Sequence, residues 1–202
     1  MPNIVFVLDG DAARRLIRRK IGKHPTPTEI ELFCRSARRT EETVVECYYY
    51  DCAPFGEIRP LPISGADRDF SAEVVYSVAT KFQERMLDNS FFKFKKGYLS
   101  FNGWNIKDSV IVDLMRCPRV LTDDDFVPHL SQKQVDMKIG LDIAKISLAK
   151  SVERILLITC DSDFIPIVDF AQSNGVEVDL ILDTKSIIKG ALKNKCGHLR
   201  YV

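Results

Sequence analysis

The chain has 202 residues, a formal net charge of +1, and a composition that is 46% hydrophobic and 28% charged. These values are ordinary for a globular protein and exclude a disordered or low-complexity chain, while the net charge is too small to indicate nucleic-acid binding by itself. No apolar run approaches the roughly 20 residues of a membrane-spanning helix, so we expect no membrane association. The length favours one domain over residues 1–202.

Most of the chain follows the periodicities of strands and helices. The predicted strands are residues 3–8, 43–50, 154–159 and 176–182, with a last strand near the C-terminus. The predicted helices are residues 11–21, a helix from an N-cap at Thr28 to about Arg39, and residues 67–89, 133–150, 163–174 and 185–195. Because strands and helices alternate at both ends of the chain, the pattern predicts a doubly wound, mostly parallel sheet.

The middle of the chain differs in character. Residues 91–105 interleave Phe, Tyr and Trp with lysines, and Asn102-Gly103 is typical of a hairpin turn. We interpret this Lys–aromatic segment as resembling an insertion in the predicted domain. Residues 110–114 favour a strand, and residues 54–62 and most of 116–131 are predicted to be loops.

The cysteines and the N-terminus bear on the compartment. The six cysteines show neither CxxC spacing nor a zinc-ligand pattern, and the run from Met1 into the first strand leaves no room for a signal peptide. We therefore expect reduced, mostly structural thiols in a cytoplasmic protein. Cys196 and His198 are spaced like half a metal site, but without further ligands in the pattern the favoured interpretation is packing.

Acidic residues follow two short apolar runs. Asp9 ends the run from Asn3 to Leu8, and Asp161 and Asp163 follow the run from Arg154 to Thr159. Buried parallel strands deliver such residues to the C-terminal edge of a sheet, where open α/β folds bind their ligands. Several carboxylates in one place repel each other unless a divalent cation lies between them. The pattern therefore predicts a metal site.

Each of these acids also has a structural interpretation. Next to Asp9, Gly10 would let a ligand approach the backbone, and Asp11 is the better placed residue to cap the helix that follows. Of Asp161 and Asp163, one could cap the next helix, which leaves the other to be explained by function.

Two further acids lie on the helix over residues 133–150. Its apolar stripe includes Ile139 and Ile143, and Asp136 and Asp142 lie at the two edges of the stripe. A carboxylate there needs a donor or a metal. Asp136 also suits the helix N-terminus, and the functional interpretation is favoured for Asp136 and left open for Asp142.

The three acidic stretches together resemble a known family. Val-Leu-Asp9-Gly, Gln132-Lys-Gln-Val-Asp136 with Gly140-Leu-Asp142 behind it, and Thr159-Cys-Asp161-Ser-Asp163-Phe-Ile-Pro are similar to the three signature stretches of NYN domains of the bacterial LabA-like branch. The resemblance implies a three-layer α/β/α fold of the PIN-like nucleases, in which an acidic cluster holds Mg²⁺ or Mn²⁺ and hydrolyses RNA. Carried over by position, the catalytic and metal-binding residues are Asp9, Asp136, Asp161 and Asp163.

RNA recognition would come from outside these motifs. Arginines at helical spacing after Asp9 could bind phosphates, and exposed aromatic residues between lysines could stack on the bases of single-stranded RNA. A solvated charged helix and a packed hairpin core are the structural alternatives. The candidate RNA-binding residues are Arg14, Arg15, Arg18, Arg19, Lys133 and Trp104. The sequence leaves open whether copies of the chain form a homo-oligomer.

Two other functions remain as alternatives. NYN domains commonly have Asn three residues after the first Asp and Gly before the Val-Asp pair, where this chain has Ala12 and Gln134. The missing Asn motivates a non-catalytic RNA- or protein-binding regulator on the same scaffold. Asp9-Gly-Asp11 also mimics the nucleophile motif of haloacid-dehalogenase-type phosphatases, with Lys133 as the lysine of that site, although Ala13 stands where that motif has Thr or Val.

Overall fold

The computed structural model describes residues 1–184 and 190–202. The strands are β1 (Asn3–Asp9), β2 (Thr43–Cys52), β3 (Ile58–Pro60), β4 (Asp67–Asp69), β5 (Lys93–Ile106), β6 (Phe126–Lys133), β7 (Arg154–Ile158), β8 (Glu177–Leu182) and β9 (His198–Tyr201). The α-helices are α1 (Gly10–Ile21), α2 (Pro27–Ala37), α3 (Val74–Asp88), α4 (Asp108–Arg116), α5 (Val135–Ala149), α6 (Ile165–Ser173) and α7 (Gly190–Lys195). Short 3₁₀ helices are η1 (Phe70–Ala72), η2 (Asp123–Asp125) and η3 (Ser162–Phe164).

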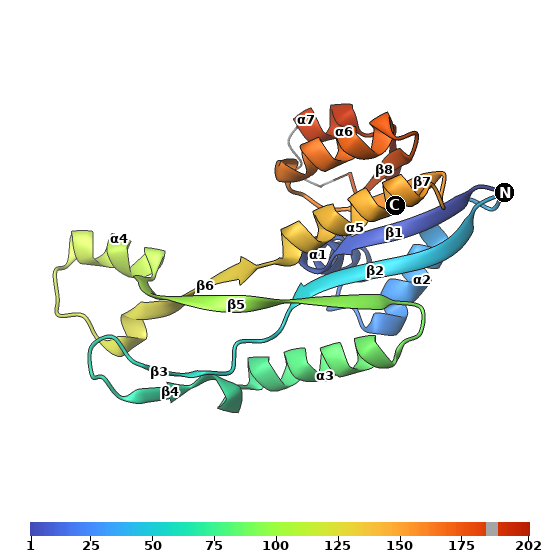
Figure 1. Cartoon of the computed structure of the whole chain (residues 1–202). Helices are drawn as coiled ribbons and strands as arrows, with labels where there is room; N and C mark the ends of the chain where they lie inside the picture. Colours follow the sequence, from blue (N-terminus) through green and yellow to red (C-terminus); the bar gives the residue numbers. More distant parts are fainter. Residues whose placement is uncertain (185–189) are drawn as a thin grey trace. The chain divides into compact units, whose positions relative to one another are not determined.

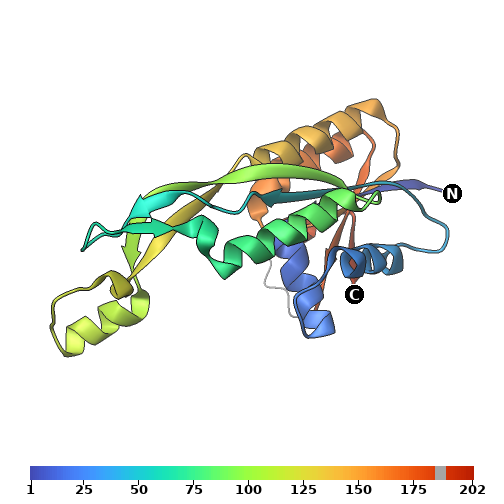
Figure 2. The ribbon, with the colours of Figure 1, turned by 90° about the horizontal axis from the view of Figure 1, so that it is seen from below.

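Seven strands form the main sheet, in the order β6-β5-β2-β1-β7-β8-β9. The strands β2, β1, β7, β8 and β9 pair in parallel, whereas β5 and β6 pair antiparallel. Figures 1 and 2 show α1 and α2 on one face of the parallel strands and α5, α6 and α7 on the other. The prediction of a three-layer α/β/α fold with a mostly parallel sheet is confirmed.

The chain divides into two compact units. Unit 1 comprises residues 1–51, 82–97 and 134–202, and unit 2 comprises residues 52–81 and 98–133. The helix α3 and the strand β5 run from one unit into the other. Unit 1 therefore holds the parallel strands and all four of the predicted metal-binding acids.

The core of unit 1 explains why β1 is apolar throughout. All five residues from Ile4 to Leu8 are buried, because helices cover both faces of this central strand. On the α1 side, Phe6 and Leu8 belong to one buried cluster with Ile17 and Tyr49. Burial of such side chains contributes about 1.5–3 kcal/mol each, which fixes the strand and the position of the residue that follows it.

The first two helices begin at capping residues other than those predicted. The helix α1 begins at Gly10 and is capped by Asp9, so the assignment of the cap to Asp11 is wrong. The helix α2 begins at Pro27 and is capped by Thr26, which forms a capping box with Glu29. The predicted cap at Thr28 is two residues late because proline at the first helical position is compatible with the helix.

Unit 2 contains the largest departures from the predicted elements. The strand β5 is continuous through Asn102-Gly103, so the predicted hairpin is wrong. Gly103 has φ +99° where the pairing register shifts between Phe101 and Trp104, which makes this glycine part of a bulge. The antiparallel partner of β5 is β6, and the prediction of a loop over most of β6 is wrong. Residues 110–114 lie in the helix α4 rather than in a strand.

Other boundaries differ less. The predicted loop 54–62 contains the short strand β3, and residues 67–72 form β4 and η1, so the helix α3 begins at Val74. The last strand is confirmed as β9. Of the predicted helix 185–195, residues 190–195 form α7 and residues 185–189 lie outside the described residues. All six cysteines are free, and none of the described helices has the length and apolar character needed to span a membrane.

Candidate metal centre

Asp9 stands where β1 turns into α1. Its Oδ1 accepts hydrogen bonds from the amides of Asp11 (3.1 Å) and Ala12 (3.5 Å), so the side chain is held at the helix N-terminus. Burial raises the pKa of Asp9 from 3.8 to about 6, against the lowering effect of these amides, and the charges of Asp11 and Asp136 raise it further. Two neighbouring acids and burial thus act against the ionised form of Asp9, and the two amides offset them only in part.

Gly10 is required by the fold rather than by a ligand. A Cβ at this position would lie 2.5 Å from the carbonyl oxygen of Tyr50 and 3.0 Å from the ring of Tyr49, so any side chain would clash with β2. The predicted role of Gly10, room for a ligand beside Asp9, is replaced by close packing of the strand-to-helix turn against the neighbouring strand.

Asp136 lies in the first turn of α5. Burial raises its pKa, and the charges of Asp161 and Asp163 raise it further. Gln134 precedes the helix with φ +71°, a left-handed conformation that glycine adopts more readily. The common Gly of the resembled family at this position therefore has a physical reason, and Gln134 adopts the same turn at some cost in strain.

Asp161 and Asp163 occupy the turn between β7 and α6. The amide of Asp161 donates to Oγ1 of Thr159 (3.1 Å), and Oδ1 of Asp161 accepts from the amide of Asp163 (2.9 Å). Both side chains are exposed. Asp161 thus caps η3, while Asp163 lies inside this 3₁₀ helix and is left without a capping role.

We refer to Asp9, Asp136, Asp161 and Asp163 as the acidic cluster. Because β1 and β7 are parallel neighbours, Asp9 and the turn after β7 lie at the same edge of the sheet, as predicted. None of the four carboxylates forms an ion pair with another described residue, so their mutual repulsion is not relieved within the described chain. The four are more widely spaced than a closed metal cage, because the described residues contain one set of three ligand atoms within 4.8 Å and it lies elsewhere.

Asp142 has a different environment. It is buried, accepts a hydrogen bond from Tyr50 Oη (2.9 Å), and lies 3.5 Å from Lys95 Nζ and 3.8 Å from Lys145 Nζ. A hydroxyl and two ammonium groups satisfy this carboxylate within unit 1. The interactions of Asp142 are thus explained by the packing of α5 against β2.

The arginines of the basic helix α1 have two kinds of environment, because one is packed against the fold and the others lie at the surface. Arg14 hydrogen-bonds to Tyr49 Oη (3.0 Å) and forms an ion pair with Asp51, so its packing accounts for it. Arg15 is exposed and pairs with Asp11 (2.9 Å), Arg19 pairs with Asp183 (3.2 Å), and Arg18 is exposed.

The other two RNA-binding candidates belong to unit 2. Lys133 is exposed at the end of β6. Trp104 donates from Nε1 to the carbonyl of Pro60 (3.0 Å) and packs against Phe70 and Phe101. These contacts place Trp104 in an aromatic core of unit 2, which is the structural alternative for this residue.

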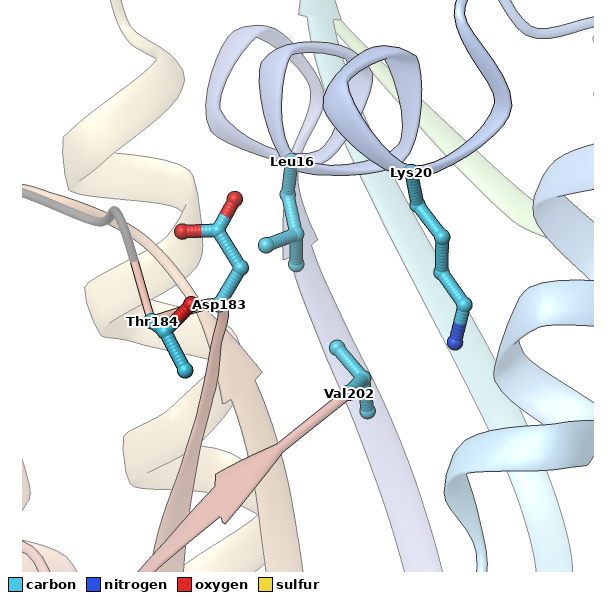
Figure 3. Close-up of a pocket in the computed structure, with 5 residues that line it drawn as sticks. All are labelled: Leu16, Lys20, Asp183, Thr184 and Val202. Atoms are coloured by element: carbon cyan, nitrogen blue, oxygen red, sulfur yellow. The ribbon is translucent and has the colours of Figure 1, made fainter.

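A further acid at the same sheet edge is absent from the residues predicted from the sequence. Asp183 directly follows β8, much as Asp9 ends β1, and the apolar run before Asp183 is the signal from which it could have been predicted. Figure 3 shows its carboxylate beside Leu16, with Thr184, Lys20 and Val202 completing the lining of a pocket of about 140 Å³. The pocket places an ammonium group and a hydroxyl at this edge of the sheet.

The comparisons with known proteins agree with the fold and bear on the class of the site. The family model described as NYN domain matches residues 119–202, which include Asp136, Asp161 and Asp163. The match supports an NYN domain over this part of the chain.

A solved structure of a protein of unknown function from Vibrio parahaemolyticus is similar over 100% of this chain and 93% of that chain, with 15% identity and a TM-score of 0.54. At this identity the likeness shows the fold alone. None of the curated proteins matches the chain.

Proposed function

We propose that the chain is a metal-dependent ribonuclease of the LabA-like branch of NYN domains and that the acidic cluster is its catalytic centre. The observation that carries the proposal is the accumulation of carboxylates from three segments at one sheet edge, where burial, together with the charges of neighbouring acids, raises the pKa of Asp9 to about 6 and raises that of Asp136. The buried carboxylates of the described residues pair with arginine or lysine instead, as Asp142 does.

The donor set suits Mg²⁺ or Mn²⁺. The cluster offers carboxylate oxygens, which hard divalent cations prefer, and includes no thiol or imidazole. Its wide spacing also fits Mg²⁺, which commonly keeps several waters and uses one or two protein carboxylates together with substrate phosphates. Asp9, Asp136, Asp161 and Asp163 would hold the ion.

The residues of the chain have separable roles in hydrolysis of a phosphodiester. A bound divalent ion would supply an activated water and charge neutralisation at the leaving oxygen. Asp9 and Asp161, each held by backbone amides at the start of a helix, fix two sides of the site, whereas the exposed Asp163 has no such bond to a described residue and can adjust to the substrate. Arg15 and Arg18, exposed on α1, attract the phosphates that the acids alone would repel.

The test is incubation of the protein with labelled single-stranded RNA in Mn²⁺ and in EDTA. We expect cleavage in Mn²⁺, none in EDTA, and none with Asp161→Asn. Asp169→Asn is the matched control, because Asp169 is an exposed acid on α6 that pairs with Lys195 outside the cluster. Cleavage that survives in Asp161→Asn at the wild-type rate would overturn the assignment of the cluster.

One observation favours the regulator as a second candidate. Ala12, at the position where NYN domains commonly have Asn, is buried in the core and offers no polar group to the site. Binding of the same RNA in EDTA, with no cleavage in Mn²⁺, would select this function. Hydrolysis of a chromogenic phosphate monoester without action on RNA would select the phosphatase.

A further inference from the structure

A second group of potential ligands lies at the opposite, N-terminal edge of the parallel strands. Glu177 is the first residue of β8, Asp179 follows on the same face, and His198 opens β9 as the register partner of Asp179. One ligand atom from each of these three residues lies within 4.8 Å of the others. The pairing of β8 and β9 therefore brings two carboxylates and an imidazole together.

Asp179 supplies an oxygen without a partner. Its side chain is completely buried. Its Oδ2 accepts a hydrogen bond from Nε of Arg200 (2.8 Å) and lies 3.5 Å from Nε of Arg154. Its Oδ1 is buried and accepts no hydrogen bond from any described residue. An unsatisfied buried polar atom of this kind destabilises the fold unless a ligand meets it. A Cβ built on Gly197 would lie 3.9 Å from Oδ1, so this oxygen faces the segment that carries His198.

The charge of the surroundings leaves room for a cation. Arg154 and Arg200 are shared with Glu42, whose Oε1 lies 2.9 Å from Arg154 and whose Oε2 lies 2.8 Å from Arg200. Glu177 is the third carboxylate on these arginines, because its Oε2 accepts a hydrogen bond from Nε of Arg154 (2.9 Å). The exposed side chains of Glu177 and His198 give an ion access from solvent.

We propose that Glu177, Asp179 and His198 bind a zinc-type transition-metal ion that joins β8 to β9. An imidazole with two carboxylates suits Zn²⁺ rather than Mg²⁺, and three protein ligands leave the fourth tetrahedral position to water. Metal–ligand distances of about 2.0–2.2 Å would require the exposed Glu177 and His198 to move toward the buried Asp179, and Glu177 to exchange its ion pair with Arg154 for the metal. Cys196 is not a member of the group, so His198 obtains its partners from β8 rather than from the neighbouring cysteine.

The experiment is a titration of the metal-free protein with Zn²⁺ in the presence of excess Mg²⁺, which competes for sites made of carboxylates alone. The readouts are calorimetry and the NMR signals of the three imidazoles, His24, His129 and His198. We expect one Zn²⁺ equivalent to shift the His198 signals. His198→Ala and Glu177→Gln should each weaken binding by about tenfold or more.

Two control variants test whether Zn²⁺ binds at this group rather than elsewhere on the chain. His24→Ala removes an exposed histidine of unit 1 outside the group and should leave Zn²⁺ binding unchanged, as should Asp161→Asn. Both tested ligands are exposed, so the fold should survive, and a Zn²⁺-dependent rise in Tm should be present in the wild type and absent in His198→Ala. Absence of Zn²⁺ binding, equal binding by His198→Ala and the wild type, or loss of binding in Asp161→Asn would overturn the proposal. Because RNA cleavage is not a readout, the outcome is independent of the proposed function.

Discussion

Replacing Asp9 by Asn should stabilise the metal-free protein at neutral pH. The pKa of Asp9 is raised by burial, so the ionised form is disfavoured in the folded state. A carboxyl whose folded pKa is raised contributes stability that is fully present below its ordinary pKa and is lost as the pH rises through the folded value. For Asp9 this loss lies between pH 3.8 and about 6. Asn carries no charge but keeps an oxygen that caps α1.

The size of the effect follows from the same pKa. A rise from 3.8 to about 6 corresponds to about 3 kcal/mol of lost stability above pH 6. Asn also loses the attraction between a carboxylate and the N-terminus of α1, about 0.3–1 kcal/mol. The net gain is about 2 kcal/mol, which for a chain of this length is a rise in Tm of about 4–8 °C.

The assay is thermal unfolding followed by circular dichroism in EDTA, at about pH 4 and about pH 7.5. We expect Asp9→Asn to exceed the wild type at the higher pH and to match it at the lower. Asp169→Asn, the exposed control, should change little at either pH. A variant that melts below the wild type in EDTA at the higher pH would refute the reasoning and assign Asp9 a structural role.

Three further substitutions test the surrounding structure. Gln134→Gly should raise the free energy of unfolding by about 0.5–1 kcal/mol in urea titrations, because it removes left-handed strain at φ +71°; a loss would show that the Gln134 side chain is needed. Trp104→Ala should destabilise unit 2 by about 3 kcal/mol, seen as faster amide exchange in β5 and β6, and unchanged exchange would place the indole outside the packing of unit 2. Glu42→Gln should lower the free energy of unfolding by about 3 kcal/mol at neutral pH, because it leaves two arginines short of a buried partner; a neutral effect would show that Asp179 alone compensates them.

The parallel half of the fold was predictable because its signals are local. Buried runs such as Ile4–Leu8 are apolar without alternation, which predicts a buried parallel strand. An acid directly after such a run, as at Asp9 and Asp161, also indicates a candidate site at the sheet edge. The acidic cluster could be found from the sequence for this reason. The raised pKa of Asp136 could not be predicted in the same way, because it depends on burial and on the charges of Asp161 and Asp163, which only the fold brings near it.

The antiparallel half was predicted less well for a physical reason. Asn-Gly favours a hairpin turn, but the same left-handed glycine conformation also serves a bulge, and only the pairing of β5 with β6 decides between them. Val110, Ile111 and Val112 of α4 are β-branched, yet the run forms a helix, because strand propensity depends on packing within a sheet rather than on the backbone alone. The group of Glu177, Asp179 and His198 could not be predicted from the sequence for a similar reason, because its members are brought together by the pairing register of β8 and β9.

The two edges of the parallel sheet handle buried negative charge in opposite ways. At the N-terminal edge, Arg154 and Arg200 neutralise Glu42 and Asp179, which permits complete burial of both carboxylates. At the C-terminal edge, the acidic cluster has no such partner among the described residues, and its repulsion persists in the metal-free chain. A divalent ion bound there should stabilise the wild type but not Asp9→Asn. The order of the two melting temperatures should therefore reverse in Mn²⁺, because the charge that destabilises the metal-free protein is the charge that binds the ion.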